Sequence, residues 1–295
     1  MITVSIRVYL GVLVFAVAVF AQPAVLTITT EPNAIVWIDE VRRGTTDASG
    51  KLALTKIAPG RHTIRVRANG FKEASAVLLP GRRTLSVKLI TTTDQAELLF
   101  QKAETAREQA RDDDARAKAA DIYREAIKLR PEFPAAHVGL ARVLFDMNKL
   151  KEAHEEIAAA RRTRPSYPEA SAVEGRIYRE EGFTDDAISA FRRAIREGGG
   201  FQPEAHVGLG RVYEDQGNYS SAVFELRKAI DQLSDSEPVI YQMLGSAYEK
   251  VNKLKDAVVA YEKYLELAPN GSYAAAIRSI LQQLKREAAG EEIIP

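Results

Sequence analysis

The sequence has no cysteine and only one tryptophan in 295 residues. A chain without cysteine forms no disulfide, offers no thiol nucleophile and builds no zinc site with cysteine ligands. At this length, burial of a hydrophobic core can hold the fold together without such cross-links. An excess of one charge is also missing, because 41 Lys and Arg residues face 40 Asp and Glu residues. This balance does not favour nucleic-acid binding, which rests on an excess of basic residues.

Motifs that would indicate catalysis, a metal or a cofactor are missing as well. The sequence contains four histidines, which are His62, His137, His154 and His206. No two of them stand four residues apart, and no His-Glu-x-x-His zinc motif occurs. The glycine run at residues 198–200 is not followed by the Gly-Lys-Ser or Gly-Lys-Thr of a phosphate-binding loop. We therefore expect a protein that is not an enzyme and that binds no cofactor and no metal.

Long apolar runs are missing except near the N-terminus. Residues 8–20 form an apolar run after Arg7, and Val19 and Ala21 provide the small residues that a signal peptidase recognises. The run is shorter than the ~20 residues that a membrane-spanning helix needs. The pattern predicts a cleaved signal peptide at residues 1–21, no membrane span after cleavage, and export to a bacterial periplasm or cell surface. The alternative is that the N-terminal segment is retained as an anchor.

Residues 22–90 have the pattern of a β domain. Apolar and polar side chains alternate at residues 25–29, 62–68 and 84–89. Such alternation gives strands with one buried and one solvated face. Turn sequences such as Asn69-Gly70 separate these segments. The segment is therefore predicted to be a small antiparallel β-sandwich.

Several short motifs mark the turns and strands of this segment. They are Pro32-Asn33-Ala34, Val36-Trp37-Ile38-Asp39, Gly44-Thr45-Thr46, Pro59-Gly60-Arg61-His62 and Gly70-Phe71. Together they resemble the PEGA domain, a small surface-associated β module. Asn33 departs from that family, which prefers glycine there, although asparagine tolerates a left-handed turn. Residues 46–52 are more similar to the β-sandwich found beside some carboxypeptidases. Either resemblance implies an accessory β domain without catalytic residues.

From Asp94 onward the apolar residues follow a helical period, and one motif repeats. Its alanine recurs at spacings of 34, 34, 35 and 35, at Ala119, Ala153, Ala187, Ala222 and Ala257. Three copies carry a glycine in the preceding segment, at Gly175, Gly210 and Gly245. We expect these eight small residues to let paired helices pack closely. The period and the Leu-Gly-x2-Tyr…Ala pattern resemble the tetratricopeptide repeat.

This resemblance covers residues 94–269 as five repeats. It implies an all-α superhelix, or α-solenoid, whose concave groove binds a partner protein or peptide. Residues 270–289 are predicted to be a C-terminal capping helix with a stripe formed by Ala276, Ile280, Leu281 and Leu284. Residues 290–295 remain as a tail. The fold class expected for the whole chain is multidomain α+β, with the β-sandwich preceding the solenoid.

The same resemblance indicates which residues face the groove. The residue after the small Gly/Ala position is an arginine in three successive repeats, namely Arg142, Arg176 and Arg211. An acid follows each arginine four residues later, at Asp146, Glu180 and Asp215. The remaining candidate groove residues are Phe145 and Arg179. Such a ladder of arginines suits the carboxylates of an extended acidic peptide. The alternative is that each arginine pairs with the acid on its own helix.

These features predict an exported, non-catalytic scaffold or adaptor in the cell envelope. The groove of the repeats binds a partner, and the β domain helps to place it. The alternative is a structural or carbohydrate-contacting surface component, in which the β-sandwich binds and the repeats act as a spacer. An exposed Trp37 beside other aromatic side chains favours that alternative.

Overall fold

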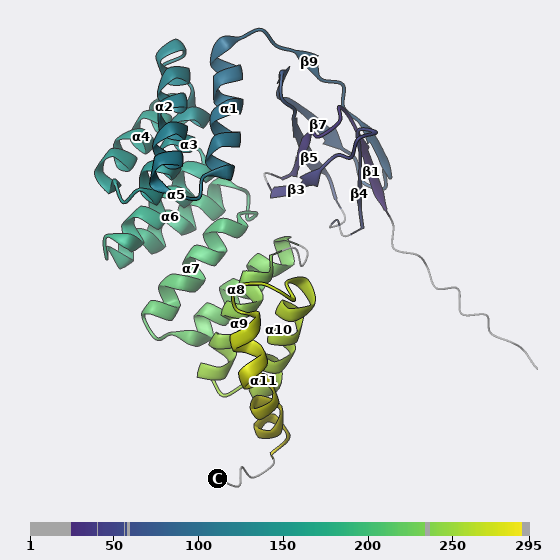
Figure 1. Cartoon of the computed structure of the whole chain (residues 1–295), viewed down its shortest axis with the longest axis vertical. Helices are drawn as coiled ribbons and strands as arrows, with labels where there is room; N and C mark the ends of the chain where they lie inside the picture. Colours follow the sequence, from purple (N-terminus) through teal and green to yellow (C-terminus); the bar gives the residue numbers. More distant parts are fainter. Residues whose placement is uncertain (1–24, 40, 56, 58–59, 234–236, 291–295) are drawn as a thin grey trace, which may run out of the picture.

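The computed structural model describes residues 25–39, 41–55, 57, 60–233 and 237–290. Within these ranges a β domain, which we call the β module, precedes a curved array of helices (Figure 1). The chain therefore has the predicted α+β class. The predicted signal peptide at residues 1–21 and the last five residues of the tail lie outside the described residues.

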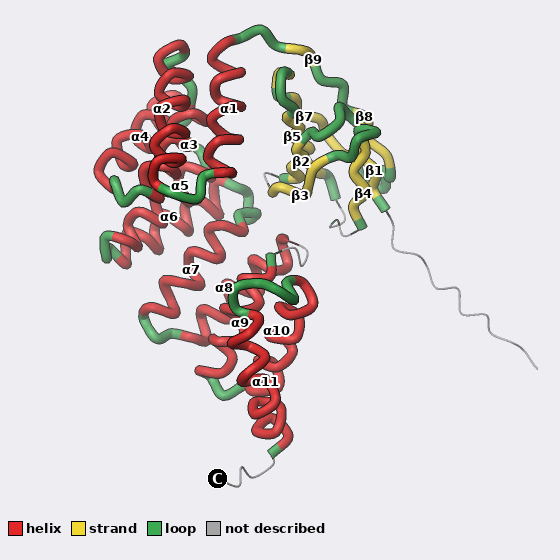
Figure 2. Tube along the Cα trace, viewed as in Figure 1, coloured by secondary structure: helices red, strands yellow, loops and turns green. Residues whose placement is uncertain are grey.

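The β module contains short strands, and Figure 2 shows them gathered on one side of the helical array. Their bounds are β1 Leu26–Thr29, β2 Ile35–Ile38, β3 Val41–Thr45, β4 Lys51–Leu54, β5 His62–Arg67, β6 Phe71–Lys72, β7 Ala74–Leu78, β8 Thr84–Ser86 and β9 Ile90–Thr91. The strand order is β4-β1-β8 in one sheet and β3-β2-β5-β7 in the other, while β6 pairs with β9.

The two sheets share one core. Ile28 of β1, Val36 of β2 and Ile64 of β5 have no exposed surface, and they belong to a single hydrophobic cluster. Alternate residues of the same strands point the other way, as period two requires. The expectation of a wholly antiparallel sandwich is wrong at one pair, because β1 and β8 run parallel. Parallel pairing requires the chain to cross over between the two strands, and alternation of side chains cannot reveal that crossover.

Eleven helices are described after the β module. They are α1 Gln95–Gln109, α2 Asp113–Leu129, α3 Pro134–Asp146, α4 Leu150–Thr163, α5 Pro168–Glu180, α6 Thr184–Glu197, α7 Pro203–Asp215, α8 Tyr219–Leu233, α9 Pro238–Lys250, α10 Leu254–Leu267 and α11 Ala274–Ala289. The Asp94 carboxylate caps α1 by accepting hydrogen bonds from the amides of Ala96 and Glu97. Four first helices, from α3 to α9, begin with proline, whose fixed φ suits the first helical position.

Each repeat is a pair of helices packed through small residues. Ala119, Ala153, Ala187, Ala222 and Ala257 have no exposed surface. The glycines lie against large side chains of the partner helix: a Cβ on Gly175 would stand 2.7 Å from the Phe191 ring, and one on Gly245 would stand 2.5 Å from the Tyr261 ring. A Cβ on Gly210 would stand 2.8 Å from Leu226. These positions are therefore small because the neighbouring helix occupies the space of a side chain.

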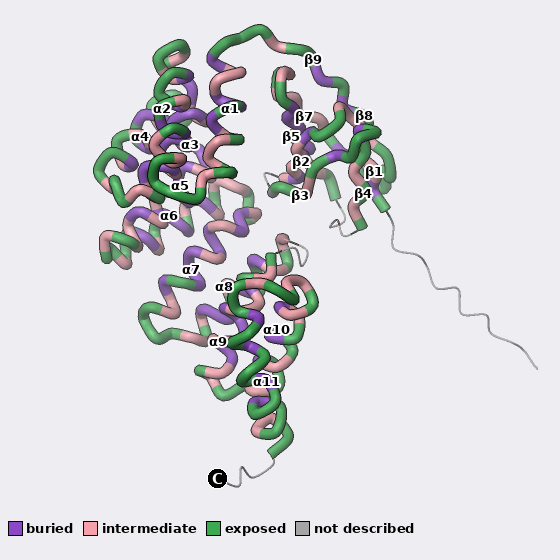
Figure 3. Tube along the Cα trace, viewed as in Figure 1, coloured by how far each residue is buried: buried purple, intermediate pink, exposed green. Residues whose placement is uncertain are grey.

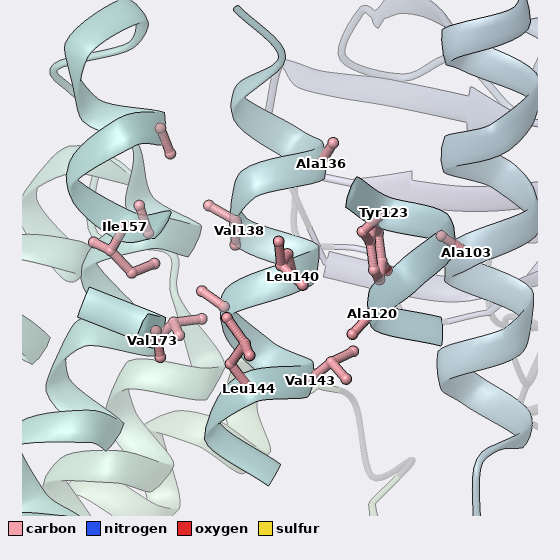
Figure 4. Close-up of a cluster of buried hydrophobic side chains, with 14 of the residues drawn as sticks. Ala103, Ala120, Tyr123, Ala136, Val138, Leu140, Val143, Leu144, Ile157 and Val173 are labelled. Atoms are coloured by element: carbon pink, nitrogen blue, oxygen red, sulfur yellow. The ribbon is translucent and has the colours of Figure 1, made fainter. Parts of the chain in front are cut away.

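The interior of the array is continuous from one repeat to the next. Figure 4 shows Tyr123 of α2 and Leu140 of α3 pointing into the same cluster, where both are almost wholly buried. Figure 3 marks buried residues along the helices: α3 is buried over most of its length, whereas a second helix such as α6 buries one stripe and leaves its other side exposed or partly exposed. This is the pattern of an amphipathic helix in a solenoid, where every repeat packs on its neighbours.

The last helix, α11, packs on α10 with a face that differs in part from the predicted one. Ile277, Leu281 and Leu284 are buried, whereas Ala276 and Ile280 are exposed. The predicted stripe was therefore wrong by about a third of a turn at its N-terminal end. Alanine and isoleucine occur on both faces there, so apolar character alone did not fix the rotation of the helix.

Candidate binding groove

The first helices of successive repeats line one cavity of about 700 Å³. The three ladder residues lie along it, with Arg142 on α3, Arg176 on α5 and Arg211 on α7. Phe145, Arg179 and Glu180 also line this cavity. Six of the eight candidate groove residues therefore line the cavity. The other two, Asp146 and Asp215, lie outside the lining and form ion pairs with Arg176 and Arg179, which do line it. The repeat spacing accordingly brings the arginines of three repeats to one surface.

The arginines form ion pairs between repeats. Arg142 donates two hydrogen bonds to Glu204 of α7, at 2.9 and 2.7 Å. Arg176 lies 3.4 Å from Asp146 of the preceding repeat and 3.6 Å from Glu204. The alternative interpretation, in which each arginine pairs with the acid four residues later on its own helix, is therefore not what the structure shows for Arg142 and Arg176. The arginine side chains extend across the groove to carboxylates of other first helices, and Arg142 of α3 reaches past α5 to Glu204 of α7.

Two further contacts hold this surface in place. Arg179 donates to Asp215 of the next repeat, at 2.7 and 3.2 Å between the nitrogen and oxygen atoms. The Arg176 guanidinium stacks over Phe145, 4.4 Å from its ring centre. Each contact joins two consecutive repeats, so the groove-facing residues stabilise the stacking of the array as well as lining it.

Electrostatics distinguish the members of the ladder. Burial acts to lower the pKa of Arg142, but the charge and hydrogen bonds of Glu204 outweigh it and raise that pKa. Burial likewise acts to raise the pKa of Glu204, yet the charge of Arg142 and its hydrogen bonds lower it overall. Burial lowers the pKa of Arg176, and the nearby charge of Arg142 adds to that effect. Both pKa shifts therefore favour the ionised form of the Arg142–Glu204 pair.

Arg211 differs from the other two arginines. Its side chain is exposed, and in the described part of the chain no carboxylate lies within 4.0 Å of it, although its charge acts on Glu214 three residues later in α7. Val207 stands one turn earlier on α7, and the neighbouring α9 adds Val239, which is 40% exposed, and Met243. This end of the cavity thus offers an available cation beside an apolar surface.

The β module forms another wall of the same cavity, through Trp37 and Arg42. Trp37 lies on the outer face of the four-stranded sheet, with the guanidinium of Arg65 4.3 Å and that of Arg67 5.2 Å from its ring. It is neither in the core of a second sheet nor on an open surface among other aromatic side chains, because this face is turned toward the helices.

Sequence reasoning missed two acids that organise this surface. Glu169 and Glu204 follow the prolines that begin α5 and α7, so they occupy the same position in consecutive repeats. Glu169 pairs with Arg65 of the β module and Glu204 with Arg142. The signal was present in the recurrence of Pro-Glu at residues 168–169 and 203–204. This recurrence alone did not indicate that the two glutamates pair with arginines, since an acid at the first turn of a helix is also explained by the helix dipole.

No group of histidines and acids suited to a metal is found among the described residues. His137 lies 2.5 Å from Glu156 of α4, and His206 lies 2.7 Å from Glu225 of α8. These two pairs occupy equivalent places and join the two helices of a repeat, which is a packing role. Over the ranges that the structure describes, no helix is both long and apolar enough to cross a membrane.

Comparison with known proteins identifies the repeats. Three family profiles, each described as tetratricopeptide repeat, match residues 110–177, 172–238 and 238–270. The matches begin within the first helix pair and do not include the β module. No relative of this chain was found among curated proteins.

Solved structures with the same array come from several bacteria. TTC0263, a thermophilic tetratricopeptide-repeat protein of Thermus thermophilus, is 23% identical with a TM-score of 0.53; the match covers 64% of this chain and 98% of that one. The pilF protein of Pseudomonas aeruginosa is 16% identical with a TM-score of 0.55, over 66% of this chain and 88% of that one. At such identities the likeness concerns the fold.

Proposed function

The chain belongs to the tetratricopeptide-repeat proteins, and on that premise we propose that it is an exported, non-catalytic adaptor that binds an acidic segment of a partner protein. Such arrays present a concave surface suited to binding a protein. The observation that carries the proposal is the available cation Arg211, beside Val239 and Met243 in a cavity of about 700 Å³. A cavity of this size accommodates a few residues of a peptide.

We propose that the ligand binds only part of the arginine ladder. Because Glu204 binds Arg142 with two hydrogen bonds, a ligand carboxylate would have to displace a partly buried ion pair to reach it. Arg211 needs no such exchange. The ligand we propose therefore carries a carboxylate for Arg211 and an apolar side chain for the surface formed by α7 and α9.

The location proposed for this activity is the cell envelope. Its support is the apolar run at residues 8–20, with the small residues Val19 and Ala21 at its end, which is typical of a cleaved signal peptide. The proposed role of the β module, as a PEGA-like accessory domain, is supported by its small sandwich and its turn motifs. Asn33, at the turn where that family prefers glycine, has a φ of 56°, the left-handed conformation that asparagine tolerates.

A carbohydrate-binding role for the β module has less support. Sugar-binding surfaces rely on aromatic side chains that are free to stack on the ligand. Trp37 instead lies in a slot between the module and the helices, and among the described residues of the module it is the one aromatic side chain that lines this slot.

Binding of a defined peptide tests the groove proposal. A fluorescein-labelled peptide of alternating glutamate and leucine is titrated with the full chain, and its anisotropy is followed; a lysine–leucine peptide of equal length is the control. Arg211→Ala is expected to weaken binding about tenfold, since a hydrogen bond between charged groups contributes about 1.5–3 kcal/mol. Arg196→Ala, which removes an exposed arginine of α6 outside the cavity, should leave affinity unchanged.

Equal affinity of wild type and Arg211→Ala for the acidic peptide would overturn the groove proposal, as would tighter binding of the lysine–leucine peptide. The envelope proposal is tested separately by N-terminal sequencing of the protein from its native cells. A first residue of Gln22 is expected, and a chain that begins at Met1 in the cytoplasm would contradict export.

A further inference from the structure

The β module is fixed against the concave side of the array by complementary charges. Arginines on the outer face of its sheet meet glutamates of α1 and α5. The pairs are Arg42–Glu108 at 2.8 Å, Arg65–Glu169 at 3.4 Å and Arg67–Glu104 at 3.7 Å. Arg65 and Arg67 are only 13% and 10% exposed, so water screens their pairs less than it screens a surface pair.

Directed hydrogen bonds fix the same contact. Gln101 of α1 accepts a bond from the amide of Gly70 at 2.9 Å and donates one to the carbonyl of Phe71 at 2.8 Å. Its side chain is buried, and the guanidinium of Arg67 stacks over Phe100 at 4.6 Å. A buried amide that satisfies the backbone of another domain defines one orientation, because rotation of the module would leave these polar groups unpaired.

This orientation places Trp37 and Arg42 opposite the ladder. Both residues line the 700 Å³ cavity with Arg142, Arg176 and Arg211. A second cavity of about 440 Å³ lies between the module and α1, and the two cavities share four lining residues, which are Trp37, Arg42, Arg142 and Glu169. The two cavities therefore adjoin at these four residues, Trp37 among them, and together they form a slot between the sheet and the helices.

We propose that the ligand site is composite, with Trp37 of the β module forming its apolar wall and the array supplying the cation that fixes the ligand's carboxylate. The ligand class is an extended acidic peptide that carries an apolar side chain beside a carboxylate. Trp37 is the specificity-determining residue for that side chain, because its half-buried indole is held by Arg65 and Arg67 and faces the cavity. This inference rests on the groove function proposed above.

Trp37 is the only tryptophan of the chain, so its fluorescence reports on this wall without labels. The glutamate–leucine peptide, unlabelled and free of tryptophan, is titrated into the full chain while Trp37 emission and its quenching by acrylamide are measured. We expect the emission to shift and the quenching to fall, with the same midpoint as the anisotropy of the labelled peptide. A ligand against the indole excludes both water and acrylamide.

The two proposals fail in distinguishable ways. Binding seen by anisotropy with unchanged Trp37 emission and quenching would overturn the composite site and leave the groove function standing. An absence of binding by anisotropy would overturn the groove function and the composite site with it. A shift of emission that does not saturate with the anisotropy would also contradict a single shared site.

Substitution of Trp37 provides an independent test, with a control on the same face of the same sheet. Trp37→Ala is expected to weaken peptide binding about fivefold or more, as loss of a buried aromatic contact does. Val77→Ala should leave binding unchanged, because Val77 is 44% exposed on this face but lies outside the cavity. Trp37→Phe should recover part of the affinity. Full affinity in Trp37→Ala would overturn the proposal, and should that variant not fold, unchanged affinity in Trp37→Phe together with an unresponsive wild-type fluorescence would do so.

Discussion

The two halves of the concave face have opposite chemistry although they are built from the same repeat. The first half presents Glu104, Glu108 and Glu169, and the arginines of the β module bind them. The second half presents the exposed Arg211 and Val239, and no ion pair joins either residue to the module in the described part of the chain. The small residues of the repeat set where the helices lie, and the groove-facing residues are free to vary. The fold thus provides a scaffold, while the groove-facing positions decide what each half binds.

The arginine ladder crosses the boundary between these halves. Arg142 belongs to the closed half, because Glu204 holds it with two hydrogen bonds, and Arg211 belongs to the open half. Arg176 lies between them and shares Glu204 and Asp146. The three arginines occupy the same repeat position but differ in how readily a ligand can reach them, with Arg211 the most accessible and Arg142 the least.

The largest effect is expected from a substitution that disrupts the helix packing on which both halves depend. A side chain at Gly208 of α7 would collide with the Phe191 ring of α6, since even a Cβ there would stand 2.3 Å from it. Gly208→Leu should lower the free energy of unfolding by about 3 kcal/mol, as overpacking of a close contact does. Urea unfolding followed by circular dichroism measures it. Asp231→Leu on the exposed side of α8 is the control, and an unchanged urea midpoint for Gly208→Leu would contradict this packing.

Opening the closed half should have two effects of opposite sign. Glu204→Gln removes the charge that Arg142 and Arg176 share, so stability should fall by about 2 kcal/mol, the cost of leaving a charged hydrogen-bonding group poorly paired. Affinity for the acidic peptide should rise several-fold, because two more arginines then become available. Urea unfolding and anisotropy give the two values, with the exposed Glu132→Gln as control. Weaker peptide binding in Glu204→Gln would contradict the division into halves.

A smaller effect separates two glutamates of the covered half. Glu104 contacts Arg67 and Arg107 and accepts a hydrogen bond from Tyr123, whereas the Arg42–Glu108 pair is 47% and 40% exposed. Glu104→Gln should loosen the module and increase acrylamide quenching of Trp37. Glu108→Gln should change it little, since exposed pairs contribute about 0–1 kcal/mol. Equal quenching in the two variants would show that Glu104, the less exposed of the two acids, does not fix the module.

The smallest effect concerns pH. Burial acts to lower the pKa of His137, but the hydrogen bond and charge of Glu156 and the Pro131 carbonyl raise it overall, against the charge of Arg162. A raised pKa means that folding binds a proton more tightly, so this stabilisation is complete below the unfolded value of about 6.5 and is lost as pH rises through the folded value. The difference in unfolding free energy between wild type and His137→Asn should therefore shrink from about pH 6 to about pH 8. A difference that grows with pH would contradict the pairing.

The frame of the fold was predictable from the sequence, because a period of 34 to 35 residues places small residues such as Ala153 and Gly210 at helix contacts. The charge pattern of the groove was only partly predictable. Arg142, Arg176 and Arg211 do lie on one surface, yet their partners come from other repeats. Pairing between repeats depends on the curvature of the array, which sequence spacing does not contain.

The place of the β module was not predictable either. Trp37 lies on the face opposite Val36 and Ile38, as the alternation of side chains along a strand requires, but alternation could not reveal that this face meets helices. The contact depends on a sheet residue, Arg65, and a helix residue, Glu169, that are 104 positions apart in the chain. Arginines that alternate along one face of a strand predict that this face is exposed to solvent. The structure shows that the face is instead covered by helices, whose glutamates pair with the arginines.

The claim that a ligand uses the open half can be tested most directly by hydrogen exchange of the full chain with and without the glutamate–leucine peptide. The account predicts slower amide exchange in α7 and α9, at Pro203–Asp215 and Pro238–Lys250, and in β2 beside Trp37. Exchange in α2, which lies outside the cavity, should not change. Protection of α2 or of other second helices, with none in α7 and α9, would contradict it.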